Sequence, residues 1–160
     1  MHQTTPRRGI VTIGTLILLL VALVATAVGD RPAPRGQYFN GRPIHRVGVV
    51  RLRVTAYSPD ERSCGRFADG ITASGFSVQT NAGHLVAADT TVFPFGSLLS
   101  IPGYARSTVV PVLDRGSAIR GLRADVLFPT HDEALAWGVR MVEVEVWAYL
   151  DGGGLAFHRP

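Results

Sequence analysis

The sequence predicts a mainly β fold, a compact six-stranded β-barrel with one short helix, preceded by an N-terminal apolar helix. Three observations lead to this prediction. Short apolar or alternating runs bounded by turn residues recur after residue 48, which is the pattern of strands. A single segment among them carries helix start and stop signals. Hydrophobic residues make up 46% of the 160-residue chain, which is enough to form a packed core rather than a disordered chain.

Residues 1–28 have the pattern of an export signal. Arg7 and Arg8 precede an uncharged apolar stretch, and Ala25-Thr26-Ala27 offers a cleavage site. The stretch is also nearly long enough to span a bilayer as a helix. A cleaved signal and a retained membrane anchor are therefore both open. Either alternative predicts an exported protein of the periplasm or cell envelope, which contacts the membrane only if the helix is retained.

Residues 29–47 combine prolines, glycines and arginines without apolar periodicity, so we expect an exposed basic linker. The folded domain is predicted over residues 48–150, followed by a loose tail over 151–160. The first strand, 50–57, alternates apolar and polar residues, as a half-buried strand does. The other predicted strands are 85–88, 97–101, 108–113, 124–128 and 141–149.

The one predicted helix covers residues 131–137. Thr130 is a suitable N-cap, and Glu133 stands three residues later, where it completes a capping box. Gly138 provides the stop signal. The spacing therefore predicts both ends of the helix.

The charge balance narrows the classes of partner. The net charge is +4 and the pI about 10.0, and all 16 cationic residues are arginine. A basic protein of this kind suits a polyanionic partner. No arginine-rich run is interleaved with aromatic residues, which argues against nucleic acid. The one cysteine, Cys64, excludes an intrachain disulfide and a cysteine-only zinc site.

Three aspartates, Asp89, Asp114 and Asp125, each stand at an end of a short apolar run. Carboxylates tied to buried strands are costly unless something uses or satisfies them. A polar turn joins the runs that hold Asp114 and Asp125, so these two carboxylates can approach each other and raise at least one pKa. A carboxylic acid that stays protonated near neutral pH can donate a proton to a leaving group. The alternative makes Asp114 a turn former and Asp125 an ordinary satisfied polar group.

A loop of small residues, 68–75, precedes these runs. Its hydroxyls either line a sugar-binding groove or belong to a plain surface loop. Three aspartates also offer oxygen ligands for a hard cation, but proton transfer by aspartate requires neither a metal nor a cofactor.

The chain resembles the three-aspartate (3D) domain, a double-psi β-barrel shared with membrane-bound lytic transglycosylase A and the stationary-phase survival proteins of Gram-positive bacteria. The resemblance covers roughly residues 49–147. It rests on eight segments in family order: VTAYSP (54–59), TASG (72–75), VAAD (86–89), FPFGS (93–97), IPGY (101–104), DRGSAIRG (114–121), RADV (123–126) and FPTHDEA (128–134).

This resemblance implies cleavage of the β-1,4 bond between N-acetylmuramic acid and N-acetylglucosamine in peptidoglycan, by a monomeric enzyme. It implies that Asp125 is the catalytic acid and base, and that Asp89 and Asp114 shape the pocket, stabilise positive charge and raise the pKa of Asp125. The residues implied in substrate binding are Thr72, Ser74, Tyr57 and Arg120. The same resemblance implies acid–base use of the aspartates, and on that ground we expect a site without metal or cofactor.

The chain departs from the family pattern in one motif. The usual Asp-Thr-Gly-Gly is here Asp114-Arg115-Gly116-Ser117, and the family's lysine is Arg120. The Arg115 charge is expected to lower the pKa of Asp114. Two other functions remain open on the same fold: a wall-binding barrel without catalysis, and a glycoside hydrolase. An aspartic protease is disfavoured, because the Asp114 turn has no second copy in the chain.

Overall fold

The computed structural model describes residues 36–152. The predicted export signal and the residues of the predicted tail after 152 lie outside the described residues. Within the described part of the chain, no helix is both long and apolar enough to cross a bilayer.

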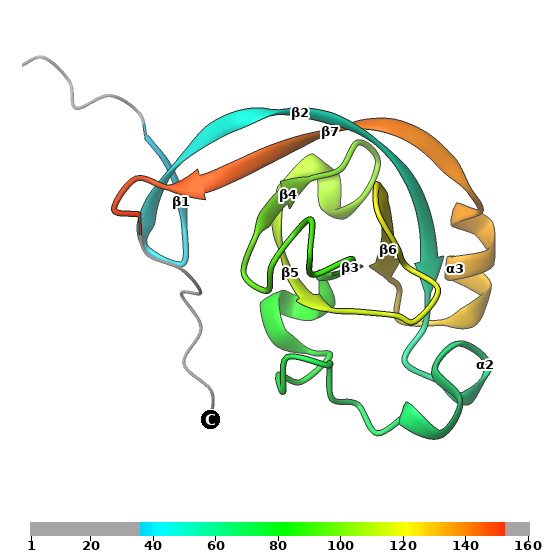
Figure 1. Ribbon diagram of the computed structural model, residues 1–160. Coiled ribbons are helices and arrows are strands. Elements are labelled where there is room, and N and C mark those ends of the chain that lie inside the picture. The colour runs from blue at the N-terminus through cyan, green and yellow to red at the C-terminus, as the bar shows by residue number, and fades with distance from the viewer. Residues whose placement is uncertain (1–35, 153–160) are drawn as a thin grey trace, which may run out of the picture. The chain divides into compact units, whose positions relative to one another are not determined.

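Seven strands form one sheet, in which six close into a barrel (Figure 1). The sheet order is β1-β2-β6-β3-β5-β4-β7, and β7 pairs again with β2. Pairings β2–β6 and β3–β5 are parallel, and the others are antiparallel. The predicted six-stranded β-barrel is therefore confirmed. The strands are β1 (Gln37–Phe39), β2 (Arg42–Tyr57), β3 (Val86–Ala88), β4 (Leu98–Ser100), β5 (Val109–Asp114), β6 (Arg123–Leu127) and β7 (Arg140–Tyr149).

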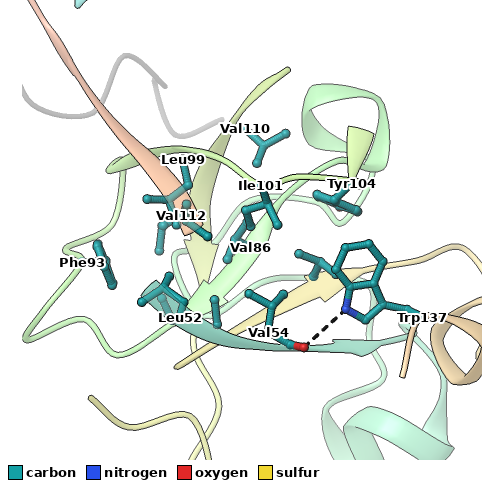
Figure 2. Packing of buried hydrophobic residues seen from close by; sticks show 14 residues of the cluster. Leu52, Val54, Val86, Phe93, Leu99, Ile101, Tyr104, Val110, Val112 and Trp137 are labelled. Atoms are coloured by element: carbon teal, nitrogen blue, oxygen red, sulfur yellow. Dashed lines mark hydrogen bonds between the residues drawn. The ribbon is translucent and has the colours of Figure 1, made fainter. Parts of the chain in front are cut away.

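Alternation along the strands fills the barrel interior. Buried and outward-facing residues alternate along the middle of β2, whereas all residues of β3 and β4 are buried. On β2, for example, Leu52 and Val54 are fully buried, whereas Arg51 is exposed. The main cluster, much of which Figure 2 shows, is Leu52, Val54, Val86, Ala88, Phe93, Leu99, Ile101, Tyr104, Val110, Val112, Ala124, Val126, Trp137 and Val144.

The predicted helix is confirmed as α3 (His131–Trp137). Both capping-box bonds are present: the Glu133 N–H donates to the Thr130 hydroxyl at 3.3 Å, and the Thr130 N–H donates to the Glu133 carboxylate at 3.2 Å. Trp137 ends the helix and its indole N–H donates to the Val54 carbonyl at 3.4 Å (Figure 2). The helix therefore packs on β2, and Trp137 joins the main hydrophobic cluster.

The prediction of an exposed linker over residues 29–47 is wrong from Gln37 onward. Asn40 and Gly41, both with positive φ, form a two-residue turn between β1 and β2, and Asn-Gly is a strong hairpin signal. β2 starts at Arg42, and its N-terminal half pairs with β7. Phe39 and Ile44 are buried in a small cluster with Leu98 and Tyr149. In Figure 1 the long β2–β7 ribbon carries β1 at its far end.

The prediction of only one helix missed several short turns of helix. These are α2 (Glu61–Cys64) and three 3₁₀ segments, η1 (Gly65–Phe67), η2 (Thr80–Gly83) and η3 (Ala105–Ser107). Each covers four residues or fewer, which is too short for apolar periodicity to reveal.

Tyr104 joins two strands through its hydroxyl. The hydroxyl lies 2.8 Å from the Leu127 carbonyl and 3.2 Å from the Leu85 carbonyl, and it accepts the Leu85 N–H at 3.1 Å. The side chain is 2% exposed. One buried phenol therefore satisfies backbone groups beside both β3 and β6.

Tyr104→Phe should lower the free energy of unfolding by about 1–3 kcal/mol, because it leaves buried backbone groups without a partner. Urea denaturation measures the change. Tyr38→Phe is the matched control, since Tyr38 is 65% exposed and should change stability by less than about 0.5 kcal/mol. Equal stability of the two variants would contradict the role given to the Tyr104 hydroxyl.

Candidate functional site

Strand register places two of the predicted aspartates on one row of the barrel's outer face. Thr55 on β2 pairs with Asp125 on β6, Asp125 pairs with Ala87 on β3, and Ala87 pairs with Asp114 on β5. The neighbouring residues Val54 and Ala124 are fully buried inside the barrel, so the row faces outward. One strand separates the two carboxylates, which places their backbones roughly 10 Å apart.

Asp125 has the electrostatics of a proton donor. Burial raises its pKa to about 6, the Thr55 hydroxyl and the Arg123 charge oppose this shift, and the Asp114 charge adds a smaller upward contribution. Its Oδ1 atom is buried and has no hydrogen-bond partner. The two carboxylates were expected to raise a pKa mainly by mutual repulsion, but burial of Asp125 is the larger cause.

Asp114 is held by three donors. The Tyr57 hydroxyl donates to Oδ2 at 2.8 Å, and the N–H groups of Ala73 and Arg115 donate to Oδ1 at 2.9 and 2.8 Å. Burial, first, and the Asp114 charge raise the pKa of Tyr57, so its phenol remains a donor. The contact from Arg115 is its backbone N–H, rather than the side-chain charge emphasised by the sequence.

Thr72 and Ser74 are buried, each 4% exposed, and bond to protein. The two hydroxyls lie 3.1 Å apart, Thr72 also donates to the Phe76 carbonyl at 3.0 Å, and Ser74 donates to the Leu113 carbonyl. These bonds fasten the loop to β5, and the exposed residue between them, Ala73, gives its N–H to Asp114. Thr72 and Ser74 therefore hold the loop that reaches Asp114, and their contact with a substrate stays a prediction.

Asp89 is separate from the other two aspartates in its contacts. It accepts the Thr91 N–H and hydroxyl at 3.0 and 2.7 Å and the Gly121 N–H at 2.7 Å. Hydrogen bonds from Gly121 and Thr91, with a smaller contribution from the Arg120 charge, lower the pKa of Asp89 to about 2. Asp89 is therefore an ionised carboxylate that ties the 115–122 loop to the turn after β3, and exposed Arg120 acts on it.

The expectation that Asp89 raises the pKa of Asp125 is not met. Arg123 and Asp114 are the charges that act on the Asp125 carboxyl. Spacing along the chain treats the three aspartates alike, whereas their hydrogen bonds give them three different environments. The sequence missed Thr55, whose only signal is its place in the strand opposite Asp125.

Two hollows of the described chain lie away from this row. A cavity of about 90 Å³ lies between His84, Tyr104 and Phe128, and an open hollow of about 570 Å³ lies between the starts of α2 and α3. Neither is lined by Asp114 or Asp125. Across residues 36–152, no three or more His, Cys, Asp or Glu side chains gather as metal ligands would.

Cys64 is half-buried behind the row. Its thiol donates to the Ser58 carbonyl at 3.3 Å, and burial, with the neighbouring carboxylates, raises its pKa. A raised thiol pKa disfavours the nucleophilic thiolate. Cys64 therefore packs beside the site as a neutral thiol.

Comparison with known proteins finds one matching family and two similar curated proteins. Residues 84–150 match the family described as the 3D domain. Two Bacillus subtilis (strain 168) proteins are similar: the cell wall-binding protein YocH, 34% identical over 98 residues, and the putative cell wall shaping protein YabE, 32% identical over 99. Each match covers 61% of this chain but 32% and 23% of those proteins, so the chain spans a third or less of their length.

Two solved structures are also similar, both of the E. coli lytic transglycosylase MltA. One is a variant in an apo form, with a TM-score of 0.39, and the other is MltA, with a TM-score of 0.38. Each is 22% identical to this chain and covers 49% of this chain and 27% of the MltA chain.

The raised pKa of Asp125 should make stability fall as pH rises from about 4 to about 6. In this range the unfolded carboxyl has ionised while the folded one keeps its proton, so folding takes up a proton. Asp125→Asn should remove this slope, which after allowance for partial exposure amounts to about 1–2 kcal/mol. Denaturation at several pH values measures it, with exposed Asp132→Asn as control. An unchanged slope in Asp125→Asn would contradict the assignment.

Asp89→Asn should loosen the 115–122 loop without changing the barrel. An amide in place of the carboxylate weakens the bonds from Gly121 and Thr91, which are bonds to a charged acceptor. Hydrogen exchange followed by NMR should then be faster at the Gly121 amide and unchanged at barrel amides such as Val126. Unchanged exchange at Gly121 would rule out this role for Asp89.

Proposed function

On the premise that this chain is a 3D-domain protein, matched over residues 84–150, we propose that it cleaves the glycan strands of peptidoglycan as a lytic transglycosylase. The bond is the β-1,4 link between N-acetylmuramic acid and N-acetylglucosamine. Relatives named for binding and shaping the cell wall support the substrate class. The same names, with the export-signal pattern of residues 1–28, support a location in the cell envelope.

The observation that carries the proposal is the environment of Asp125. Its pKa of about 6 makes it a stronger candidate for proton transfer than an ordinary aspartate. One of its carboxyl oxygens is buried and unpartnered, while the residue as a whole is only half-buried.

The first step is general acid catalysis. Protonated Asp125 donates its proton to the glycosidic oxygen, the bond from the muramic acid C1 to that oxygen breaks, and the N-acetylglucosamine end leaves as an alcohol. Positive charge then develops on the ring of the muramic acid. The departing group carries the proton, and Asp125 is left as a carboxylate.

In the second step the carboxylate of Asp125 takes the proton of the muramic acid 6-hydroxyl. The O6 atom forms a bond to C1 of the same sugar, which gives a 1,6-anhydro product and consumes no water. The hydroxyl is already attached to the reacting sugar, so proximity replaces a second catalytic carboxylate. The proton returns to Asp125, which restores the starting acid.

Asp114 is the second carboxylate of the outer row. Its three donors fix its orientation, and its place two strands from Asp125 suits electrostatic stabilisation of the positively charged ring. Tyr57, Thr72 and Ser74 support Asp114. Asp89 and Arg120 order the neighbouring loop.

A wall-binding module without turnover is the second candidate. One observation favours it: the relative YocH is named a cell wall-binding protein. In that case the outer row would hold a glycan strand through hydrogen bonds, with no bond broken.

Asp125→Asn should abolish release of anhydro-muropeptides from purified peptidoglycan, because an amide cannot donate the proton. The expected loss is about 10²–10⁴-fold, the usual contribution of a general acid. Mass spectrometry of the products measures it, with exposed Asp132→Asn as the matched control.

The same experiment separates the alternatives. Products of the native chain that carry reducing ends, heavier by one water, would make it a hydrolase. Sedimentation of the native chain with the wall, without any product, would favour the binding module. Full activity of Asp125→Asn would overturn the assignment of the acid.

A further inference from the structure

Two arginines stand side by side on the outer face of the barrel. Arg53 on β2 and Arg123 on β6 are direct register partners in the parallel β2–β6 pair. Leu52, Val54 and Ala124 point into the core, so both arginine side chains leave the barrel on the side that carries Asp125. Like charges directly across a strand pair are destabilising. This arrangement therefore needs a compensating negative charge.

The nearby strands supply little of that charge. Arg53 faces Met141 on β7, and Arg51, two residues earlier, is exposed and faces Glu143. The ion pairs among residues 36–152 join Arg42 to Asp151 and Arg46 to Glu145, and neither includes these three arginines.

Two carboxylates near the pair, Asp89 and Asp125, form no ion pair with either arginine. Asp89 is bonded to Thr91 and Gly121. Asp125 lies two residues beyond Arg123, and its pKa of about 6 leaves only half of it ionised at pH 6. On β2 and β6 themselves, three arginines (Arg51, Arg53 and Arg123) share the outer face with one carboxylate, Asp125, so positive charge is in excess there.

The position fits a substrate that reaches Asp125. The row of Arg53 and Arg123 is two residues along the strands from the row of Thr55 and Asp125, a distance of roughly 7 Å. This is about the size of one sugar ring with its substituents. A polymer bound across Asp125 would thus present a neighbouring substituent to the two guanidinium groups.

We propose that Arg53 and Arg123, bordered by Arg51, form a subsite for an oxyanion of the cell wall, a carboxylate or a phosphate, beside Asp125. The planar guanidinium binds such groups with paired hydrogen bonds. The bound anion would also relieve the repulsion between the two arginines. This inference rests on the proposed function for its substrate, and it adds the charged group by which the wall is held.

Arg53→Gln is the main test variant, since Arg53 does not act on the pKa of Asp125 whereas Arg123 does. The full chain is sedimented on ice with purified cell walls over a range of salt concentrations. Affinity should fall roughly tenfold in Arg53→Gln and further in Arg53→Gln/Arg123→Gln, with a weaker salt dependence.

Arg46→Gln is the matched control, because Arg46 lies on the same strand but is paired with Glu145 away from Asp125. It loses the same charge and should bind walls like the native chain. Thermal unfolding of each variant checks that the barrel is intact. Arg53→Gln and Arg46→Gln are comparable because each removes one arginine from β2.

Two treated wall preparations identify the source of the anion. Walls stripped of phosphate polymers by hydrofluoric acid should bind less well if the group is a phosphate. Walls stripped of stem peptides by an amidase should bind less well if it is a peptide carboxylate. On the wall that has lost the anion, Arg53→Gln and the native chain should bind equally weakly, because the arginine no longer has a partner there.

Native affinity of Arg53→Gln, equal losses in Arg53→Gln and Arg46→Gln, or no wall binding by the native chain would each overturn the subsite. These outcomes are distinct from failure of the proposed reaction. If no anhydro products form but wall binding still depends on Arg53, the proposed reaction is wrong and the subsite stands. Cleavage that needs Asp125 but not Arg53 would do the reverse.

Discussion

The pairing of β7 with β2 is the interaction on which the rest of the structure depends. Ten register pairs join the two strands, from Ile44 with Tyr149 to Val54 with Arg140. This pairing closes the ring, so β2 has a partner on both sides and the barrel has no open edge there. Closure also fixes which side chains point inward. Asp125 and its neighbours are on the outer face because Val54, Ala124 and Val126 fill the interior.

The outer site is built in layers from this frame. Burial against the barrel wall sets the protonation of Asp125, whereas hydrogen bonds set the orientation of Asp114. The loop of Thr72 and Ser74 is fastened to β5, and through Ala73 it reaches the Asp114 carboxylate. A second small cluster, containing Phe76, Leu85 and Leu113, packs under this loop and keeps water from its inner side. The contacts that pack this loop against the barrel therefore also fix the orientation of Asp114.

Much of the barrel could be predicted from the sequence, because the governing signals are local. Thr130, Glu133 and Gly138 define α3 through their own backbone and side-chain bonds, and apolar runs mark six strands. The hairpin of β1 was missed because Pro43 and the arginines outweighed the Asn40-Gly41 turn. The burial of Ile44 there depends on β7, about a hundred residues later in the chain.

The candidate site was predicted less completely, and for a physical reason. The sequence singled out Asp89, Asp114 and Asp125. It did not show that only Asp114 and Asp125 lie on the same row. Register between β3, β5 and β6, including an irregularity beside Val86, decides this, and it is a property of long-range pairing. The hydrogen bonds of Thr72 and Ser74 could not be predicted either, because their partners Phe76 and Leu113 are set by the folded loop and by β5.

The location of Asp125 on the outside of a closed barrel has a consequence for how such a protein can change. Interior residues determine the stability of the barrel, and outer residues determine which molecules can contact its surface. Substitutions at the two sets should thus combine almost independently, as distant sites do. An exposed arginine of β2, such as Arg51, could be exchanged while the interior of the barrel is retained. Stability of this fold and the chemistry of its outer surface can therefore change separately.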